Sequence, residues 1–272
     1  MTRSGFGKVA AITGAGSGLG GALALALASH GWNVAVSDIN MVGAQETVDA
    51  LHGVGVEAFA RSVDVTRPED FEAWAEAIQA KWGRCDLLVN NAGVAAVGEI
   101  GEVSLEDWRW CVDVDLFGVV HGCHVFVPRM KAQGSGHVVN ISSVAAYAMS
   151  AHMGPYNVAK AGVVALSETL RGEVKDAGIG VTVVCPAFFR TRLAETMRSS
   201  NDKIGGIARK LVESAGMSAD TVAERIVDAV IHNKPYVVEP SVAQFMFVLR
   251  RLFPAKASVA IGAMTKLAKR FG

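Results

Sequence analysis

The chain has 272 residues, 51% of them hydrophobic, and its 26 Lys and Arg balance 26 Asp and Glu for a formal net charge of 0. This length and hydrophobic content exclude a disordered chain and fit one large globular domain. A protein built mainly to bind nucleic acid needs an excess of Lys and Arg, so the neutral balance argues against that class. The 29 glycines follow no repeating period, which excludes a collagen-like chain and predicts many tight turns.

Short β-branched runs alternate with amphipathic stretches along the chain. This alternation is typical of a parallel sheet with helices on both faces. The clearest helix is predicted over Pro68–Trp82, where apolar residues repeat at helical spacing. We predict a single doubly wound α/β domain with a mostly parallel seven-stranded sheet, whose strands are Lys8–Thr13, Asn33–Asp38, Val56–Ser62, Leu87–Asn90, Gly136–Ile141, Val181–Cys185 and Tyr236–Val238.

Two segments depart from this rhythm. Residues 191–216 form a polar insertion after the sixth strand, where we expect a mobile substrate lid. Residues 1–239, taken as the main domain, hold 20 Lys and Arg against 26 Asp and Glu, a net charge of −6, whereas residues 240–272 hold six Lys and Arg and no acid. We predict a basic amphipathic tail over 240–272, with Met264, Leu267, Ala268 and Phe271 opposite Lys266, Lys269 and Arg270. The tail either packs over the pocket or a subunit interface, or lies on an anionic membrane surface.

A glycine-rich turn connects the first strand to an Ala/Leu-rich helix. The run Thr13-Gly14-Ala15-Gly16-Ser17-Gly18-Leu19-Gly20 presents backbone N–H groups and a helix N-terminus, as a pyrophosphate site requires, although a glycine-rich run alone also fits a simple turn. Glycine is needed because a Cβ would block the approach of a phosphate and of the neighbouring strand. Asp38 ends the second strand about 20 residues later, where a carboxylate binds an adenosine ribose and repels a 2′-phosphate. NAD is therefore favoured over NADP, and the alternative for Asp38 is a helix N-cap.

Tyr156 precedes Lys160 by one helical turn, so the two side chains share a face of the predicted helix. A free phenol has a pKa of about 10, and a nearby ammonium favours its ionised form, as a base near neutral pH requires. Ser143 follows the fifth strand, where its hydroxyl is able to face the same substrate oxygen. Ser142 competes with it for that role, and both also fit an ordinary turn at a strand end.

Taken in chain order, these residues resemble the short-chain dehydrogenase/reductase family. The resemblance also rests on Asp64-Val65 after the third strand and Asn90-Asn91-Ala92-Gly93 after the fourth, and it runs from Lys8 to about Val238. It implies a Rossmann-like domain that interconverts an alcohol and a carbonyl with NAD(P)(H) and assembles as a homodimer or homotetramer.

The resemblance implies roles for individual residues. Tyr156 would be the acid/base, Lys160 would hold the nicotinamide ribose and lower the tyrosine pKa, and Ser143 would orient the substrate oxygen. Asp38 would bind the adenosine ribose, and Asp64 and Val65 the adenine. The remaining cofactor contacts would come from Gly14, Ser17, Gly18, Leu19, Gly20, Asn91, Ala92, Gly93, Pro186, Phe189 and Thr191, besides Tyr156 and Lys160.

Two positions depart from the family pattern. Asp115 stands where family members commonly have Asn, in Val114-Asp115-Leu116-Phe117-Gly118, and that Asn helps to seat a water in the proton relay to the lysine. A carboxylate still accepts hydrogen bonds but has no amide to donate, so we include Asp115 in the catalytic set and expect a modified relay. Ala187 replaces a usual glycine, which removes only the freedom to adopt positive φ.

The expected substrate is a lipophilic secondary alcohol or ketone, because the segments around the site are apolar: Ala95, Val97, Ala145, Met149, Met153, Phe188 and Phe189. Arg190 and Arg192 are able to meet an anionic tail such as an acyl carrier. The alternatives are therefore a 3-oxoacyl thioester reductase, which would more often prefer NADPH, and a non-catalytic NAD-binding protein.

Neither metal nor disulfide is expected. Cys85, Cys111, Cys123 and Cys185 form no CxxC pair, so we predict free thiols in a reducing cytosol. The pair His121 and His124 lacks a further ligand set, and a packed helix explains it better than a metal. The charge-free stretch Val9 to Ser37 is broken by glycines and divides into strand, turn and helix, and no signal-peptide pattern is evident, so we expect a cytoplasmic protein.

Overall fold

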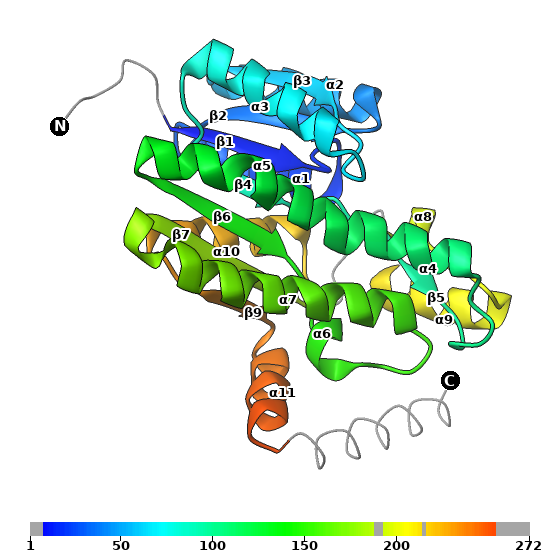
Figure 1. Ribbon diagram of the computed structural model, residues 1–272. Helices are drawn as coiled ribbons and strands as arrows, with labels where there is room; N and C mark the ends of the chain where they lie inside the picture. Colours follow the sequence, from blue (N-terminus) through cyan, green and yellow to red (C-terminus); the bar gives the residue numbers. More distant parts are fainter. Residues whose placement is uncertain (1–7, 188–192, 214–215, 254–272) are drawn as a thin grey trace.

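The computed structural model describes residues 8–187, 193–213 and 216–253. Its centre is a seven-stranded sheet in the order β3-β2-β1-β4-β6-β7-β9, in which every neighbouring pair is parallel (Figure 1). The predicted doubly wound α/β fold is confirmed. The strands are β1 (Val9–Thr13), β2 (Asn33–Asp38), β3 (Ala58–Ser62), β4 (Leu87–Asn90), β6 (Gly136–Ile141), β7 (Ile179–Pro186) and β9 (Tyr236–Glu239).

Strand limits differ from the sequence prediction where pairing with a neighbour decides them. β3 begins at Ala58 rather than Val56, because Ala58 is the first residue in register with β2, opposite Val34. β7 is longer than the predicted 181–185, because it pairs with β6 from Ile179 onward and with β9 as far as Pro186. The sheet shifts the limits of β1 and β9 by a single residue each.

Helices cover both faces of the sheet (Figure 1). One face carries α1 (Gly18–Ser29), α2 (Met41–Val54) and α10 (Ala219–Ile231), and the other carries α3 (Pro68–Trp82), α5 (Gly118–Gln133) and α7 (Gly154–Val174). Alternate residues of β1 supply the two cores: Ala10 and Ile12 pack on the first face, and Val9 and Ala11 on the second. Such double burial explains why the strands are nearly continuous apolar runs in the sequence.

The remaining elements are short or lie outside the two main helical layers. They are β5 (Ala96–Val97), α4 (Leu105–Val112), the π-helical turn η1 (Asp113–Phe117), α6 (Ala145–Ala148), the short 3-10 helix η2 (Lys175–Ala177) directly before β7, α8 (Leu193–Thr196), β8 (Arg198–Ser199), α9 (Asp202–Glu213) and α11 (Ser241–Leu252). α11 projects from the body after β9 (Figure 1). The apolar stripe predicted at 264–271 lies outside the described residues.

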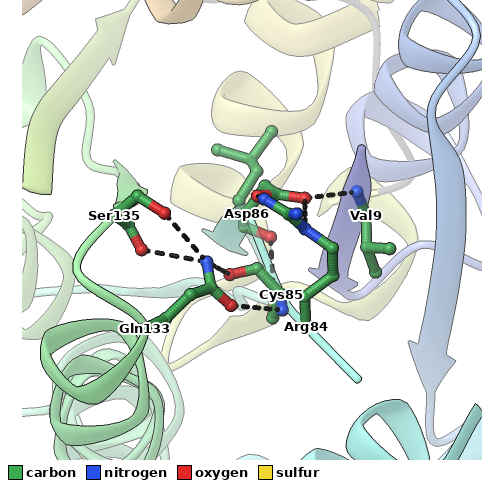
Figure 2. Close-up of polar contacts among 7 residues, drawn as sticks. Val9, Arg84, Cys85, Asp86, Gln133 and Ser135 are labelled. Atoms are coloured by element: carbon green, nitrogen blue, oxygen red, sulfur yellow. Dashed lines mark hydrogen bonds and ion pairs between the residues drawn. The ribbon is translucent and has the colours of Figure 1, made fainter. Parts of the chain in front are cut away.

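Polar contacts fix the amino end of β4 (Figure 2). Asp86 accepts a hydrogen bond from the backbone N–H of Val9 at 2.9 Å and pairs with Arg84. Gln133, at the end of α5, accepts from Cys85 N and donates to the Cys85 carbonyl, both at 3.2 Å. A cavity of about 380 Å³ between α3 and α5 opens beside Cys85 and Gln133, and no candidate site residue lines it. The chemistry predicted from the sequence therefore lies at the other, carboxyl edge.

The helical run from Leu105 to Gln133 is long and apolar enough, by length and composition, to cross a membrane. Half of its most apolar window is buried in the fold, where it packs against α3 and α7. This is typical of the core helix of a globular domain. The charge-free stretch 9–37 folds as predicted into β1, a turn, α1 and most of β2.

All four cysteines are unpaired thiols, as predicted. Cys111, Cys123 and Cys185 are buried, and burial raises the pKa of the first two to about 12 and that of Cys185 to about 11. These thiols stay protonated near neutral pH, which makes them packing residues rather than nucleophiles.

We expect Gly20→Ala to destabilise the domain. A Cβ at Gly20 would lie 2.3 Å from the Gly14 carbonyl oxygen and 2.6 Å from Asn91 Nδ2. The free energy of unfolding, measured by chemical denaturation, should fall by about 1–3 kcal/mol.

Gly21→Ala is the matched control on the same helix, because the nearest atoms to its Cβ are 3.6 Å away. It should leave stability unchanged or raise it by up to about 1 kcal/mol, since alanine is the better helix former. Equal losses in the two variants would contradict the close contact at Gly20.

Candidate functional site

The loops that follow β1 and β4 are tied together at the carboxyl edge of the sheet. Thr13 Oγ1 accepts hydrogen bonds from the backbone N–H groups of Asn91 at 2.9 Å and Ala92 at 3.0 Å. The Asn91 side chain donates back to the carbonyls of Thr13 at 2.8 Å and Gly14 at 3.0 Å. The strand order reverses at this point, since β2 and β3 lie on one side of β1 and β4 on the other. Ligands of open parallel sheets bind at such a switch point.

The glycine turn fits a dinucleotide phosphate. Gly14 and Gly18 adopt φ of +62° and +56°, a left-handed region that glycine tolerates. A Cβ at Gly14 would meet the Ala92 Cα at 2.8 Å, whereas one at Gly18 would meet nothing within 4 Å, so Gly18 faces open space. α1 has no side-chain cap from Ser17 and no acid in its first turn, which leaves its positive end open to an anion. The Leu19 side chain is buried in the core, so only its backbone faces the turn.

Asp38 lies directly beside this turn. Its Oδ2 accepts a hydrogen bond from Gly16 N at 2.9 Å, and its Oδ1 accepts one from Asn40 N at 2.9 Å. Asn40 is the N-cap of α2, and its side chain accepts from Gly43 N at 3.4 Å. The N-cap alternative for Asp38 is therefore wrong. Each carboxylate oxygen keeps a further lone pair able to accept from a ribose hydroxyl.

Asp64 and Val65 form the next corner of the same edge. Asp64 Oδ1 accepts from Thr66 N at 2.9 Å and from Thr66 Oγ1 at 2.7 Å, which closes a local turn. The Val65 carbonyl lies 2.9 Å from His121 Nδ1, and the Val65 side chain packs on Gly118. His121 is thus a packed helix residue, and the described residues contain no cluster able to hold a metal ion. Adenine binding by Asp64 and Val65 stays a prediction.

Tyr156 and Lys160 lie on the first two turns of α7 and are both buried. Lys160 Nζ is 5.6 Å from the centre of the Tyr156 ring. It donates to the Ile141 carbonyl at the end of β6 at 3.2 Å and forms an ion pair with Asp115 Oδ2 at 3.1 Å. The predicted shared face of tyrosine and lysine is present, and Lys160 is held by two elements besides its own.

The structure separates the roles of the two serines. Ser142 is buried and donates to the Lys160 carbonyl at 2.8 Å, so its hydroxyl holds the α7 backbone. Ser143 donates to the Pro186 carbonyl at 3.4 Å and accepts from Ala145 N at 3.1 Å, and its side chain lowers the pKa of the neighbouring Tyr156 phenol. Of the two serines, Ser143 is therefore the one whose side chain acts on Tyr156.

Asp115 reaches the same cluster from the π-helical turn η1. The turn directs this carboxylate inward, where it is fully buried and its Oδ1 accepts from Val94 N at 2.7 Å. Burial raises the pKa of Asp115, while the Lys160 ammonium and the Val94 N–H oppose the rise. Extra residues in a helical turn are a frequent feature of functional sites.

Burial raises the pKa of the Tyr156 phenol in the free chain, and Asp115 adds to the rise. The Lys160 ammonium and the Ser143 side chain lower the same pKa. Lys160 thus lowers the pKa of Tyr156, as the sequence predicts, but the effect of burial is larger. In the chain without cofactor, the pKa of Tyr156 therefore lies above its ordinary value.

The last predicted cofactor contacts fall between Pro186 and Thr191, and of this segment Pro186 and Ala187 are described. Pro186 ends β7 and accepts from Val144 N at 3.0 Å, and Ala187 N donates to the Glu239 carbonyl at 2.8 Å. Phe189 and Thr191, together with Phe188, Arg190 and Arg192, lie outside the described residues.

An apolar cluster packs around Tyr156. Four predicted lining residues, Ala95, Val97, Ala145 and Met153, pack together there, whereas Met149 is half exposed. The cluster also contains residues without a sequence signal: Val103, Trp108, Cys111 and Met197.

The described part of the predicted lid covers this cluster. β8 pairs with β5, with Arg198 opposite Ala96, and Arg198 binds Asp107 at 2.9 Å while its guanidinium lies 4.0 Å from the centre of the Trp110 ring. Leu193 and Ile204 pack inward from α8 and α9. The segment is helical and closely packed where the sequence indicates only a polar insertion.

Comparison with known proteins gives the family. The model of the short chain dehydrogenases matches residues 8–202. This chain belongs to that family. The predicted resemblance is confirmed.

Two curated relatives and one solved structure illustrate the likeness. The probable oxidoreductase EphD of Mycobacterium tuberculosis is 34% identical over 252 residues, which cover 89% of this chain but 43% of that protein, so the chain spans less than half of that relative. Cyclohexanol dehydrogenase of Acinetobacter sp. strain SE19 is 39% identical over 206 residues, covering 74% of this chain and 81% of the relative. A short chain dehydrogenase/reductase from Burkholderia phymatum in complex with NAD has a TM-score of 0.86 and 35% identity, covering 90% of this chain and 93% of that chain.

Proposed function

We propose that this chain is an NAD-dependent short-chain dehydrogenase/reductase that interconverts a secondary alcohol and a ketone. The observation that carries the proposal is the meeting of Tyr156, Lys160 and Ser143 at the carboxyl edge of the sheet that also holds the glycine turn. Neither the glycine turn nor the Tyr156/Lys160 pair would support this function alone, because glycine turns and Tyr/Lys pairs are each common in proteins. The solved relative from Burkholderia phymatum, which is in complex with NAD, supports the choice of cofactor.

The proposed mechanism assigns each step to a residue. NAD, when bound, supplies the carbon that accepts or returns the hydride. Gly14 to Gly20 and the start of α1 bind its phosphates, and Asp38 binds the adenosine ribose. Tyr156 Oη takes the hydroxyl proton during oxidation and returns it during reduction, while Ser143 orients the substrate oxygen. Lys160 stabilises the phenolate by its charge.

The apolar cluster around Tyr156 favours a lipophilic substrate. The cluster is made mainly of apolar side chains. Because these side chains exclude water, the electrostatic interaction between Lys160 and Tyr156 is stronger than it would be in water. Cyclohexanol dehydrogenase, whose name indicates an uncharged cyclic alcohol, is consistent with this choice. Profiling aryl, alicyclic and aliphatic alcohols beside acyl thioesters tests it, and activity confined to small charged substrates would overturn it.

The alternatives are a 3-oxoacyl thioester reductase and a non-catalytic NAD-binding protein. The first would more often use NADPH, and the carboxylate of Asp38 beside Gly16 opposes a 2′-phosphate. The second conflicts with the assembly of Ser143, Tyr156 and Lys160. A cytoplasmic location and a homodimer or homotetramer also stay proposals, and light scattering of the purified chain measures the assembly.

Tyr156→Phe should abolish the reaction while leaving the fold intact. The variant keeps the ring in its buried position but has no proton to exchange, so we expect kcat to fall by about 100-fold or more. NADH formation from an accepted alcohol measures the loss. Tyr236→Phe is the matched control, because Tyr236 is the first residue of β9, where it pairs with Val183, and it should retain parent activity.

Asp38 should set the cofactor preference. The parent is expected to use NAD⁺ well over NADP⁺, and Asp38→Ser should narrow the difference by removing the charge that opposes the 2′-phosphate. The ratio of kcat/KM for the two cofactors measures the preference. Equal use of both by the parent would contradict the role given to Asp38.

We also propose that α11 contacts an anionic membrane surface. Phe247 docks the helix on Tyr147, with ring centres 4.7 Å apart, and Gln244 donates to the Val238 carbonyl at 2.9 Å. On a neighbouring stripe, Phe245, Val248 and Leu252 are 67%, 49% and 65% exposed. This apolar stripe lies in the segment that holds six Lys and Arg and no acid, a combination typical of helices that bind anionic lipid.

The membrane proposal predicts that the chain sediments with phosphatidylserine-containing liposomes and much less with phosphatidylcholine liposomes. Phe245→Ser/Leu252→Ser should reduce the bound fraction severalfold. Ile231→Ser, which removes an apolar side chain 55% exposed on α10, is the control and should bind like the parent. Equal binding by all three proteins would remove the proposal, and a loss of oligomer in the double variant would assign the stripe to a second copy of the chain.

A further inference from the structure

The buried ion pair between Asp115 and Lys160 has a consequence for the proposed reaction. The two side chains are 0% and 4% exposed, and Asp115 Oδ2 lies 3.1 Å from Lys160 Nζ. Among the described residues, no other Asp, Glu, Lys or Arg is buried. The site therefore contains one negative and one positive charge, in a region where charges interact strongly because water does not screen them.

The groups that face the pair come from four elements. α7 contributes Tyr156 and Lys160, α4 contributes Cys111, the loop after β4 contributes the Val94 N–H, and the end of β6 contributes the Ile141 carbonyl. Ser143 faces Tyr156 from the loop after β6. The Cys111 thiol stays neutral near pH 7 because burial raises its pKa to about 12. Asp115 is thus the anion that compensates the lysine.

A neutral amide would make the same backbone contact. Asp115 Oδ1 accepts from Val94 N at 2.7 Å, and an asparagine Oδ1 in the same position accepts equally well. The negative charge is therefore not required to hold the loop after β4. Its distinct effect is electrostatic, because the carboxylate cancels part of the positive charge that Lys160 presents to Tyr156.

We propose that Asp115 is a positioning residue that sets the pH dependence of the reaction: by neutralising Lys160 it keeps Tyr156 protonated to higher pH. This inference rests on the proposed function. The direction agrees with the charges that act on the phenol, where Lys160 lowers the Tyr156 pKa and Asp115 raises it. Paired with the Lys160 ammonium at 3.1 Å, Asp115 acts here as a carboxylate, which accepts hydrogen bonds but does not donate them as an amide does.

The sign of the effect differs between the two directions of reaction. Oxidation needs the phenolate, which takes the alcohol proton as the hydride leaves for NAD⁺, so its rate rises with pH through the tyrosine pKa. Reduction needs the phenol, which gives its proton to the carbonyl oxygen as NADH gives the hydride, so its rate falls above the same pKa. Asp115 thereby favours ketone reduction at neutral pH and moves alcohol oxidation to alkaline pH.

Asp115→Asn tests the proposal in both directions. The pH profiles of kcat/KM for oxidation and reduction should each shift toward lower pH by about one unit or more, the size expected for removing a charge near an ionising group. Asp113→Asn is the matched control, because it makes the same change on the same turn at an exposed position, and it should leave both profiles unchanged. Unshifted profiles in a folded Asp115→Asn protein, or a shift toward higher pH, would overturn the proposal.

A titration without substrate separates this inference from the proposed function. The chain has three tyrosines, so the phenolate absorbance of the parent minus that of Tyr156→Phe isolates Tyr156. This phenol should ionise above its ordinary range of about 10 in the parent and at least about one unit lower when Asp115 is Asn. An inactive parent that shows this titration would reject the proposed function, while the effect of Asp115 on the ionisation of Tyr156 would stand.

Removing the charge partner of Lys160 leaves a buried ammonium uncompensated, which destabilises a fold. The thermal unfolding temperature of each variant is therefore measured beside its titration. Asp115→Ser is the second variant, because its small neutral hydroxyl also accepts from Val94 N. If neither variant folds, the parent titration still decides: ionisation of Tyr156 at or below the ordinary tyrosine pKa would overturn the proposal.

Discussion

The close contact between the turn after β1 and the loop after β4 is the constraint on which the rest of the site depends. Thr13 and Asn91 exchange hydrogen bonds across it, and Gly14 and Gly20 lie so near the opposing atoms that no Cβ fits. The contact brings two distant parts of the chain to one edge of the sheet at the point where the strand order reverses. The contact leaves the N-terminus of α1, where Gly18 faces open space, on the same side of the turn as Asp38.

A second constraint arranges the catalytic cluster around Lys160. The Lys160 ammonium contacts the Ile141 carbonyl at the end of β6, Asp115 on the π-helical turn, and the Tyr156 ring on its own helix, α7. Ser142 donates to the Lys160 carbonyl and so holds this helix in place. The cluster thus depends on the sheet, on η1 and on α7 together. A buried charge pair is costly unless both partners are held, which explains why so many backbone contacts converge on it.

Much of this arrangement is readable from the sequence because it has a local cause. The helix Pro68–Trp82 is predicted to the residue, since Pro68 starts it and Gly83, at φ +70°, ends it. The strands are visible as apolar runs because both faces of the sheet are covered. The family is recognisable from the order of its motifs along the chain: the glycine turn, Asp38, Ser143, Tyr156 and Lys160.

The remainder has a tertiary cause and leaves no local signal. β5 and β8 are two residues each and exist only because they pair with one another. The closeness of Asp115 to Lys160 depends on the π-helical turn, and the choice between Ser142 and Ser143 depends on which hydroxyl reaches the α7 backbone. The dominance of burial over Lys160 in the pKa of Tyr156 follows from packing that no pairwise spacing predicts.

The most direct test of the account is a crystal structure of the chain with NAD⁺ and an unreactive alcohol analogue. We expect the adenosine ribose on Asp38, the phosphates at Gly14 to Gly20, and the alcohol oxygen within hydrogen-bond distance of Tyr156 Oη and Ser143 Oγ. A dinucleotide bound away from the glycine turn, or an alcohol oxygen out of reach of Tyr156, would contradict it.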